Sequence, residues 1–219
     1  MRFLVLLVFS IFFLFLSASF GYSLYLGFDF SLSSVSPFRF EGMGMLIYVV
    51  ISLILKVFHR NLEFAETFCH ELNHTVFCVL SFHKVDSFLA DSEKGGKVSF
   101  SGNPNPFIVL APYAFPLFAL VALFFKLFAM PKAFPIIEGV VGFFLLFHLH
   151  SIFCEAHLRQ TDLKVYGYLF SYSAILLVNL ILVPFVFIAA GKGFDVGFEF
   201  LKNGWLMMGE LALMVWRLV

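Results

Sequence analysis

Residues 61–82 read NLEFAETFCHELNHTVFCVLSF, a stretch that is polar in its first half and apolar in its second. Its length suits one membrane-crossing helix, because a bilayer needs about 20 mostly apolar residues. His70 and His74 are four residues apart, so on a helix both imidazoles lie on one face and can bind one metal ion, with Glu71 beside the ion's open position. Ionisable groups at membrane depth are costly unless they pair, bind an ion or line a cavity. The stretch therefore predicts a metal site inside a membrane helix.

The composition of the whole chain is that of an integral membrane protein. Of its 219 residues, 61% are hydrophobic and 13% are charged, and the mean hydropathy is +0.97. Soluble domains are about half apolar and about a quarter charged. The formal net charge is zero, so we expect no nucleic-acid partner. The cysteines lie in apolar segments without metal-site spacing, and we expect small buried hydrophobic residues rather than disulfides or a zinc site at Cys69, Cys78 and Cys154.

Hydrophobic segments predict an all-α, multi-pass protein of the cell membrane, with about six transmembrane helices in one domain, residues 1–219. The first segment, 3–19, resembles a signal peptide, but we expect residues 1–20 to remain as an anchor. The tail, 198–219, either crosses the bilayer or lies in its interface. Positive charges lean only slightly toward a cytoplasmic N-terminus. The other predicted spans are residues 44–58, 61–82, 106–128, 135–153 and 165–190.

Residues 83–102 break the helical pattern. Residues 85–89 and 97–101 alternate apolar and polar side chains, and they flank a polar stretch that ends in Gly95-Gly96. Alternation around a Gly-Gly turn signal is typical of a β-hairpin. We therefore expect a short β-hairpin at the membrane surface, directly after the helix that carries the histidines.

A third metal ligand must come from another part of the chain, because a catalytic zinc site normally has three protein ligands and one open position. Of the five aspartates, Asp162 is the one that lies where a polar loop runs into a long helix. Gln160 and Thr161 can orient its carboxylate. To approach the histidines, the sixth span must begin with an irregular segment, which is tolerated where it lines a cavity.

Alternative third ligands lie in residues 148–157, an unusually polar end for a span. His148 and His150 point to different faces of a helix, so we expect them to pack or to line a cavity rather than to act as a pair. Glu155 would give a ligand set like that of soluble zinc peptidases that use a glutamate. We favour Asp162 over Glu155.

With these residues, the chain resembles the site-2-protease-like intramembrane metallopeptidases, specifically the compact M50B-like branch. The resemblance covers roughly residues 60–190, and we take residues 61–190 as the catalytic core. Besides the histidine motif and the hairpin, it rests on Ser101-Gly102, Ala111-Pro112 and Gln160-Thr161-Asp162. It implies one zinc ion per chain, with His70, His74 and Asp162 as ligands and Glu71 as the catalytic base.

The resemblance also implies a zinc metalloendopeptidase that cleaves membrane-protein or peptide substrates in the lipid bilayer by means of a zinc-bound water. Family members commonly have Gly at the position of Asn73, and the longer branches carry an Asn-Pro-Asp-Gly-type segment that is absent here. Asn73, Asn103 and Asn105 are either additional hydrogen-bond donors or packing and turn residues. The hairpin either holds an unwound substrate as an added strand or only covers helix ends.

A different class of function is also open at this point. A non-proteolytic metal carrier, or a degenerate protease fold that serves as a scaffold, would explain the additional polar groups in the spans, which are Glu63, Glu66, His148 and His150.

Overall fold

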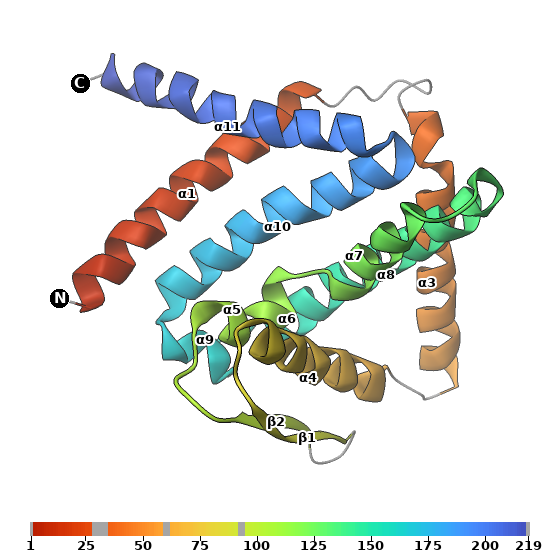
Figure 1. Ribbon diagram of the computed structural model, residues 1–219, viewed down its shortest axis with the longest axis horizontal. Coiled ribbons are helices and arrows are strands. Elements are labelled where there is room, and N and C mark those ends of the chain that lie inside the picture. The colour runs from red at the N-terminus through yellow and green to blue at the C-terminus, as the bar shows by residue number, and fades with distance from the viewer. Residues whose placement is uncertain (1, 28–34, 59–61, 92–94, 218–219) are drawn as a thin grey trace.

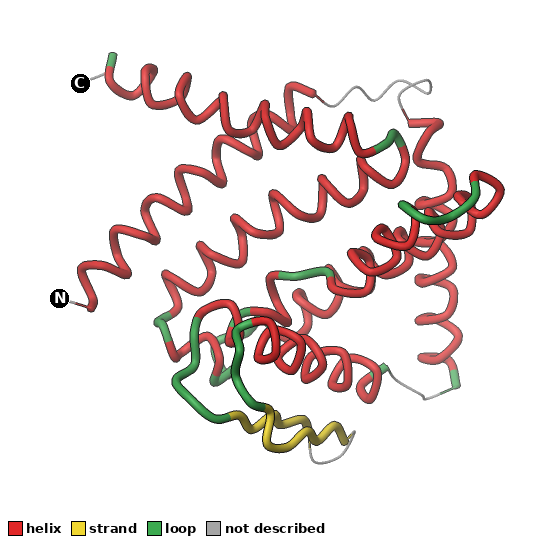
Figure 2. Tube along the Cα trace, viewed as in Figure 1, coloured by secondary structure: helices red, strands yellow, loops and turns green. Residues whose placement is uncertain are grey.

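In the computed structural model, which describes residues 2–27, 35–58, 62–91 and 95–217, helices make up most of the chain (Figures 1 and 2). The long helices are α1 (Arg2–Gly27), α3 (Arg39–Val57), α4 (Glu63–Leu80), α7 (Leu117–Lys126), α8 (Phe134–Glu155), α10 (Tyr168–Gly191) and α11 (Phe194–Trp216). The one-turn helices are α5 (Pro106–Val109), α6 (Ala111–Ala114) and α9 (Asp162–Val165). Two 3-10 turns are Ser36–Phe38 and Pro131–Ala133, and the strands are β1 (Val85–Asp91) and β2 (Gly95–Phe100).

Among the described residues, four helices are long and apolar enough to cross a membrane, namely Phe3–Gly27, Ser36–Val57, Pro131–Glu155 and Tyr168–Gly191. They correspond to the first, second, fifth and sixth predicted spans. Helix α4 is not among them, since its 18 residues include three glutamates. The total of six spans therefore stays a prediction.

The prediction of one continuous helix over residues 106–128 is wrong. The structure divides this segment into α5, α6 and α7. Phe115 is extended, with φ −116° and ψ 117°, because the residue before a proline avoids the helical region, and Pro116 has no N–H to continue the helix. The break leaves irregular backbone beside α4, where it can line a cavity.

Strands β1 and β2 pair antiparallel after α4, with Phe88 opposite Val98. Gly95 and Gly96 are paired residues of β2 rather than the turn that we expected, and residues 92–94 lie outside the described residues. The hairpin lies along α4 (Figure 1). There Phe68 packs edge-on against Phe88, with ring centroids 5.7 Å apart. That it lies at a membrane surface stays a prediction.

The other long helices pack mainly against one another rather than against α4. Helices α1, α10 and α11 pack against one another (Figure 1). Their contact includes a buried cluster that contains Leu16, Leu177 and Phe200. Helices α3 and α8 approach so closely that a Cβ atom added at Gly142 would lie 2.1 Å from the carbonyl oxygen of Glu41. Glycines permit such close backbone contact between membrane helices, where packing rather than hydrophobicity holds helices together.

The tight contact between α3 and α8 predicts the effect of one added methyl group. Gly142→Ala must push the two backbones apart, and overpacking of this kind costs about 1–3 kcal/mol. We expect a clearly lower thermal unfolding temperature in detergent. Gly209→Ala on α11 is the matched control, since its added Cβ meets nothing within 4 Å. An unchanged unfolding temperature for Gly142→Ala would show that the two helices do not touch there.

Candidate metal centre

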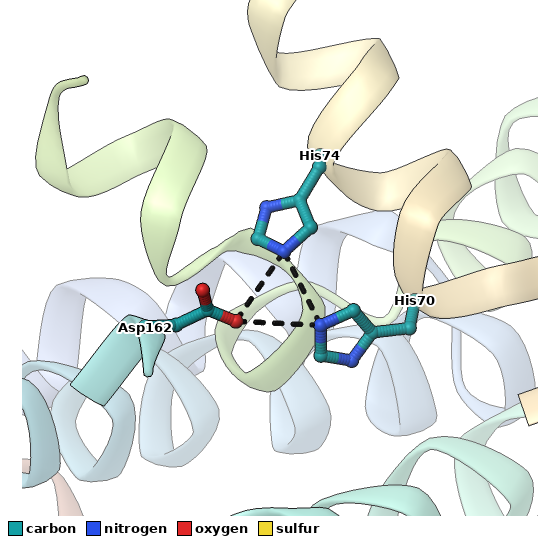
Figure 3. Close-up of side chains that lie close together, drawn as sticks. All are labelled: His70, His74 and Asp162. Atoms are coloured by element: carbon teal, nitrogen blue, oxygen red, sulfur yellow. Dashed lines mark hydrogen bonds and ion pairs between the residues drawn. The ribbon is translucent and has the colours of Figure 1, made fainter. Parts of the chain in front are cut away.

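Two imidazoles and one carboxylate come together between α4 and α9 (Figure 3). His70 and His74 lie one turn apart on α4, and their Nε2 atoms are 3.2 Å from each other. The Oδ2 atom of Asp162, at the start of α9, lies 3.4 Å from Nε2 of His70 and 3.5 Å from Nε2 of His74. The structure therefore brings together the three residues that the sequence suggested as ligands.

The irregular start of the sixth predicted span positions Asp162, as the sequence analysis expected. Helix α9 is a single turn, and Gly167, with φ 84°, separates it from α10. A positive φ is accessible to glycine at little cost. Leu163 is fully buried, and its carbonyl accepts a hydrogen bond from the Ser171 hydroxyl at 3.0 Å. These contacts fix the short helix so that its first side chain faces α4.

Each imidazole is oriented by a hydrogen bond from its other ring nitrogen. Nδ1 of His74 lies 2.8 Å from the carbonyl oxygen of Ile108, and Nδ1 of His70 lies 2.6 Å from Oε2 of Glu155. Because a carbonyl and a carboxylate only accept, both Nδ1 atoms donate. In a neutral imidazole the other nitrogen, Nε2, then carries a lone pair. Two lone pairs and a carboxylate oxygen thus point at one another.

This arrangement fits a divalent metal ion. Three acceptor atoms repel one another unless a cation lies between them. In a tetrahedral zinc site with bonds of about 2.0–2.2 Å, neighbouring ligand atoms are about 3.3–3.6 Å apart. The distances of 3.2, 3.4 and 3.5 Å match that spacing closely. Carbonyl and carboxylate partners on the outer ring nitrogens are typical of histidines that bind metals.

Tyr113 is a residue of this site that the sequence analysis missed. Its hydroxyl donates to Oδ2 of Asp162 at 3.2 Å, and its ring packs edge-on against His70 with centroids 5.2 Å apart. The amide of Asn179 donates to the carbonyl oxygen of Tyr113 at 2.8 Å, and its Oδ1 lies 2.9 Å from Nε2 of His148. One tyrosine after a proline carries no sequence signal for this role, since only the fold brings it to Asp162.

A cavity of about 370 Å³ opens beside the three clustered side chains. Glu71, which is buried, lines this cavity together with Gln160 and Thr161, two of the residues expected to surround the site. Strand β2 forms one wall through Gly96, Lys97, Val98 and Phe100. The cavity therefore gives Glu71 and the metal-binding groups a common space.

The three asparagines considered as additional hydrogen-bond donors are not among the residues that line this cavity. Asn73 is buried, and its amide donates to the carbonyl oxygen of Cys69 on its own helix at 3.0 Å. The carbonyl oxygen of Asn103 lies 3.1 Å from Nε2 of His83, and Asn103 does not line the cavity. Asn105 is the N-cap of α5, where its Oδ1 accepts from Ile108 N at 2.9 Å. That cap helps to hold the residue whose carbonyl orients His74.

The alternative ligands also have definite places. Glu155 contacts the outer nitrogen of His70, on the side of the ring away from Asp162. His148 is buried against Asn179, whereas Nδ1 of His150 lies 2.9 Å from the Tyr48 hydroxyl. The two histidines therefore serve different surroundings, as their spacing predicted.

The fold and the clustered side chains define a multi-pass integral membrane protein with a candidate metal centre. Comparison with protein families matches residues 42–155, just over half of the chain, to the family described as Peptidase M50B-like. The chain therefore belongs to this family of site-2-protease-like membrane peptidases, whose M50 members are zinc metallopeptidases. The matched residues include His70, His74 and Glu155 but end before Asp162. Comparisons with curated proteins and with solved structures gave no match.

The contact between Glu155 and His70 predicts a loss of metal affinity in Glu155→Gln. The amide keeps the shape of the side chain but removes the charge that orients the imidazole and makes it more basic. Loss of such a partner typically weakens metal binding about 10–100-fold. Competition with a chromogenic chelator measures this, with Glu63→Gln on the exposed start of α4 as the control. Equal zinc affinity in the two variants would contradict the orienting role.

Proposed function

We propose that the protein is a zinc-dependent intramembrane peptidase that hydrolyses peptide bonds of membrane-protein substrates. The observation that carries this proposal is the convergence of three acceptor atoms, from His70, His74 and Asp162, beside the buried Glu71 in one cavity. Membership of a peptidase family supports the class of reaction. We assign the two histidines and Asp162 as the zinc ligands.

Glu71 is the general base in this proposal. Zinc, when bound, makes a water molecule acidic enough to act as a nucleophile near neutral pH and polarises the carbonyl of the scissile bond. Glu71 follows His70 in the chain and lines the same cavity, so its carboxylate can accept the proton of that water. It then returns the proton to the nitrogen of the leaving amine. A buried position suits this role because bulk water does not compete for the proton.

The surrounding groups keep the ligands in place during these proton transfers. Glu155 and the Ile108 carbonyl hold the two rings by their Nδ1–H groups, which leaves each Nε2 free to bind metal. The Tyr113 hydroxyl donates to the Asp162 carboxylate. Because each of these partners comes from a different helix, the packing of α5, α6, α8 and α9 around α4 maintains the geometry.

The hairpin supplies the side of the cavity where a substrate would bind. A helical substrate hides its peptide bonds and must unwind before hydrolysis. Residues Gly96, Lys97 and Val98 of β2 line the cavity, so an extended segment added to the hairpin edge would lie beside Glu71. This supports the interpretation of the hairpin as a substrate-binding strand rather than only a cover.

Substitution of the proposed base tests the function directly. We expect Glu71→Gln to retain the zinc content of the wild-type protein and to lose at least about a hundredfold in cleavage rate of a membrane substrate, because general-base catalysis contributes about 10²–10⁴. The measurements are metal analysis and cleavage in detergent or vesicles. Glu63→Gln is the control with the same chemical change on the exposed start of α4. Unchanged activity in Glu71→Gln would instead favour a metal carrier or scaffold.

Asp162→Ala separately tests the third ligand. We expect this variant to bind zinc much more weakly, since two imidazoles alone remain. Unaltered zinc content and activity would remove Asp162 from the site.

The close approach of β2 to Glu71 gives a further prediction. A Cβ atom added at Gly96 would lie 2.4 Å from both Cγ and Oε1 of Glu71, so Gly96→Ala must displace the carboxylate or the strand. We expect a cleavage rate at least tenfold lower with zinc content unchanged. Gly209→Ala, remote from the cavity, is the control. A fully active Gly96→Ala variant would show that β2 does not lie against Glu71 in the working enzyme.

A further inference from the structure

Cys154 and His150 contact each other near the end of α8, and both are residue types that can bind a metal ion. They are four residues apart on the helix, and Sγ of Cys154 lies 3.5 Å from Nε2 of His150. Cys154 is exposed, so the sequence prediction that all three cysteines are buried is wrong for this residue and holds only for Cys78. Cys154 lies in the last turn of α8, which ends at Glu155.

His150 is held through its Nδ1 atom, as His70 and His74 are in the first site. Its Nδ1 lies 3.3 Å from Oε1 of Glu66 on α4 and 2.9 Å from the Tyr48 hydroxyl on α3. When Nδ1–H donates to these oxygens, the lone pair of Nε2 faces the sulfur of Cys154. A carboxylate behind an imidazole is a common feature of metal sites. The histidine is held by two helices other than its own.

The charge around the thiol favours a cation rather than a free thiolate. Glu155 follows Cys154 directly in the chain, and the Glu66 carboxylate lies 3.3 Å from the His150 ring that contacts Cys154, so two acidic groups lie near the thiol. A catalytic cysteine normally has positive charge beside it. A bound metal ion reverses this balance, because it stabilises the thiolate and is itself attracted by the two carboxylates.

The distance between the two ligand atoms also fits a metal ion. In a tetrahedral site with a sulfur bond of about 2.3 Å and a nitrogen bond of about 2.0–2.1 Å, the two atoms are about 3.5–3.6 Å apart. The observed 3.5 Å agrees. A thiolate and an imidazole together prefer zinc and similar borderline ions over calcium or magnesium.

We propose that Cys154 and His150 bind a second divalent transition-metal ion, in a site separate from that of His70, His74 and Asp162. The nearest other acidic groups, Glu66 and Glu155, are already engaged with His150 and His70. Two protein ligands at an exposed position give weaker and more readily exchanged binding than three ligands beside a cavity. The proposal concerns metal binding alone and does not depend on peptidase activity.

Cobalt distinguishes the two sites, because only the second contains sulfur. A thiolate bound to Co²⁺ gives an intense charge-transfer absorption in the near ultraviolet, which two imidazoles and a carboxylate do not give. The experiment uses the full chain, reduced, stripped of metal and titrated with Co²⁺ in detergent. We expect this band in the wild-type protein and in His70→Ala, and we expect added Zn²⁺ to remove it.

Matched variants identify the ligands. Cys154→Ser should abolish the band, and His150→Ala should weaken cobalt binding at the band at least tenfold. Cys69→Ser, a half-buried cysteine on α4, is the control and should keep the band. Absence of the band in the wild-type protein, or its persistence in Cys154→Ser, would overturn the proposal. Loss of the band in Cys69→Ser would also contradict it.

A second readout uses the unmodified chain and so does not depend on the folding of a variant. Zn²⁺ should slow the alkylation of Cys154 by a maleimide, measured by mass spectrometry of the labelled peptide, at least tenfold. An alkylation rate that is the same with and without zinc would count against the site.

Discussion

The approach of the Asp162 carboxylate to two imidazoles is the contact on which the arrangement of this protein depends. Its Oδ2 lies 3.4 and 3.5 Å from the Nε2 atoms of His70 and His74, and all three side chains are at least partly buried. Such a group of acceptors is unfavourable in a membrane protein unless a cation compensates it. Hydrogen bonds with Glu155, the Ile108 carbonyl and Tyr113 hold the three side chains in this arrangement.

The supporting hydrogen bonds form a continuous network around these atoms. On one side, His148 contacts Asn179, whose amide holds the carbonyl of Tyr113, and the tyrosine hydroxyl donates to Asp162. On the other side, Glu155 holds His70. Buried polar networks fix a unique geometry when each member is satisfied. This network explains why α8 and α10, which are otherwise rich in apolar residues, retain His148 and Asn179.

Irregular backbone provides the space that the site needs. Phe115, which is extended before Pro116, separates α6 from α7, and Gly167 separates α9 from α10. Non-helical backbone at membrane depth is tolerated where it is buried in protein or lines a cavity. The hairpin adds a wall to the same cavity through Gly96. The short helices α5 and α9 and strand β2 thus contribute residues to the cavity that contains Glu71.

The sequence by itself determined the helical membrane class and the pairing of His70 with His74, because hydropathy and a four-residue spacing are local properties. It also pointed to Asp162, by exclusion and by resemblance, but left Glu155 open. Only the tertiary structure placed Glu155 behind His70 and brought Tyr113 to Asp162, since contacts across 85 and 49 residues depend on how the helices pack. The pairing of Cys154 with His150 is local as well, whereas the contacts of the His150 ring with Glu66 and Tyr48 depend on how α8 packs against α4 and α3.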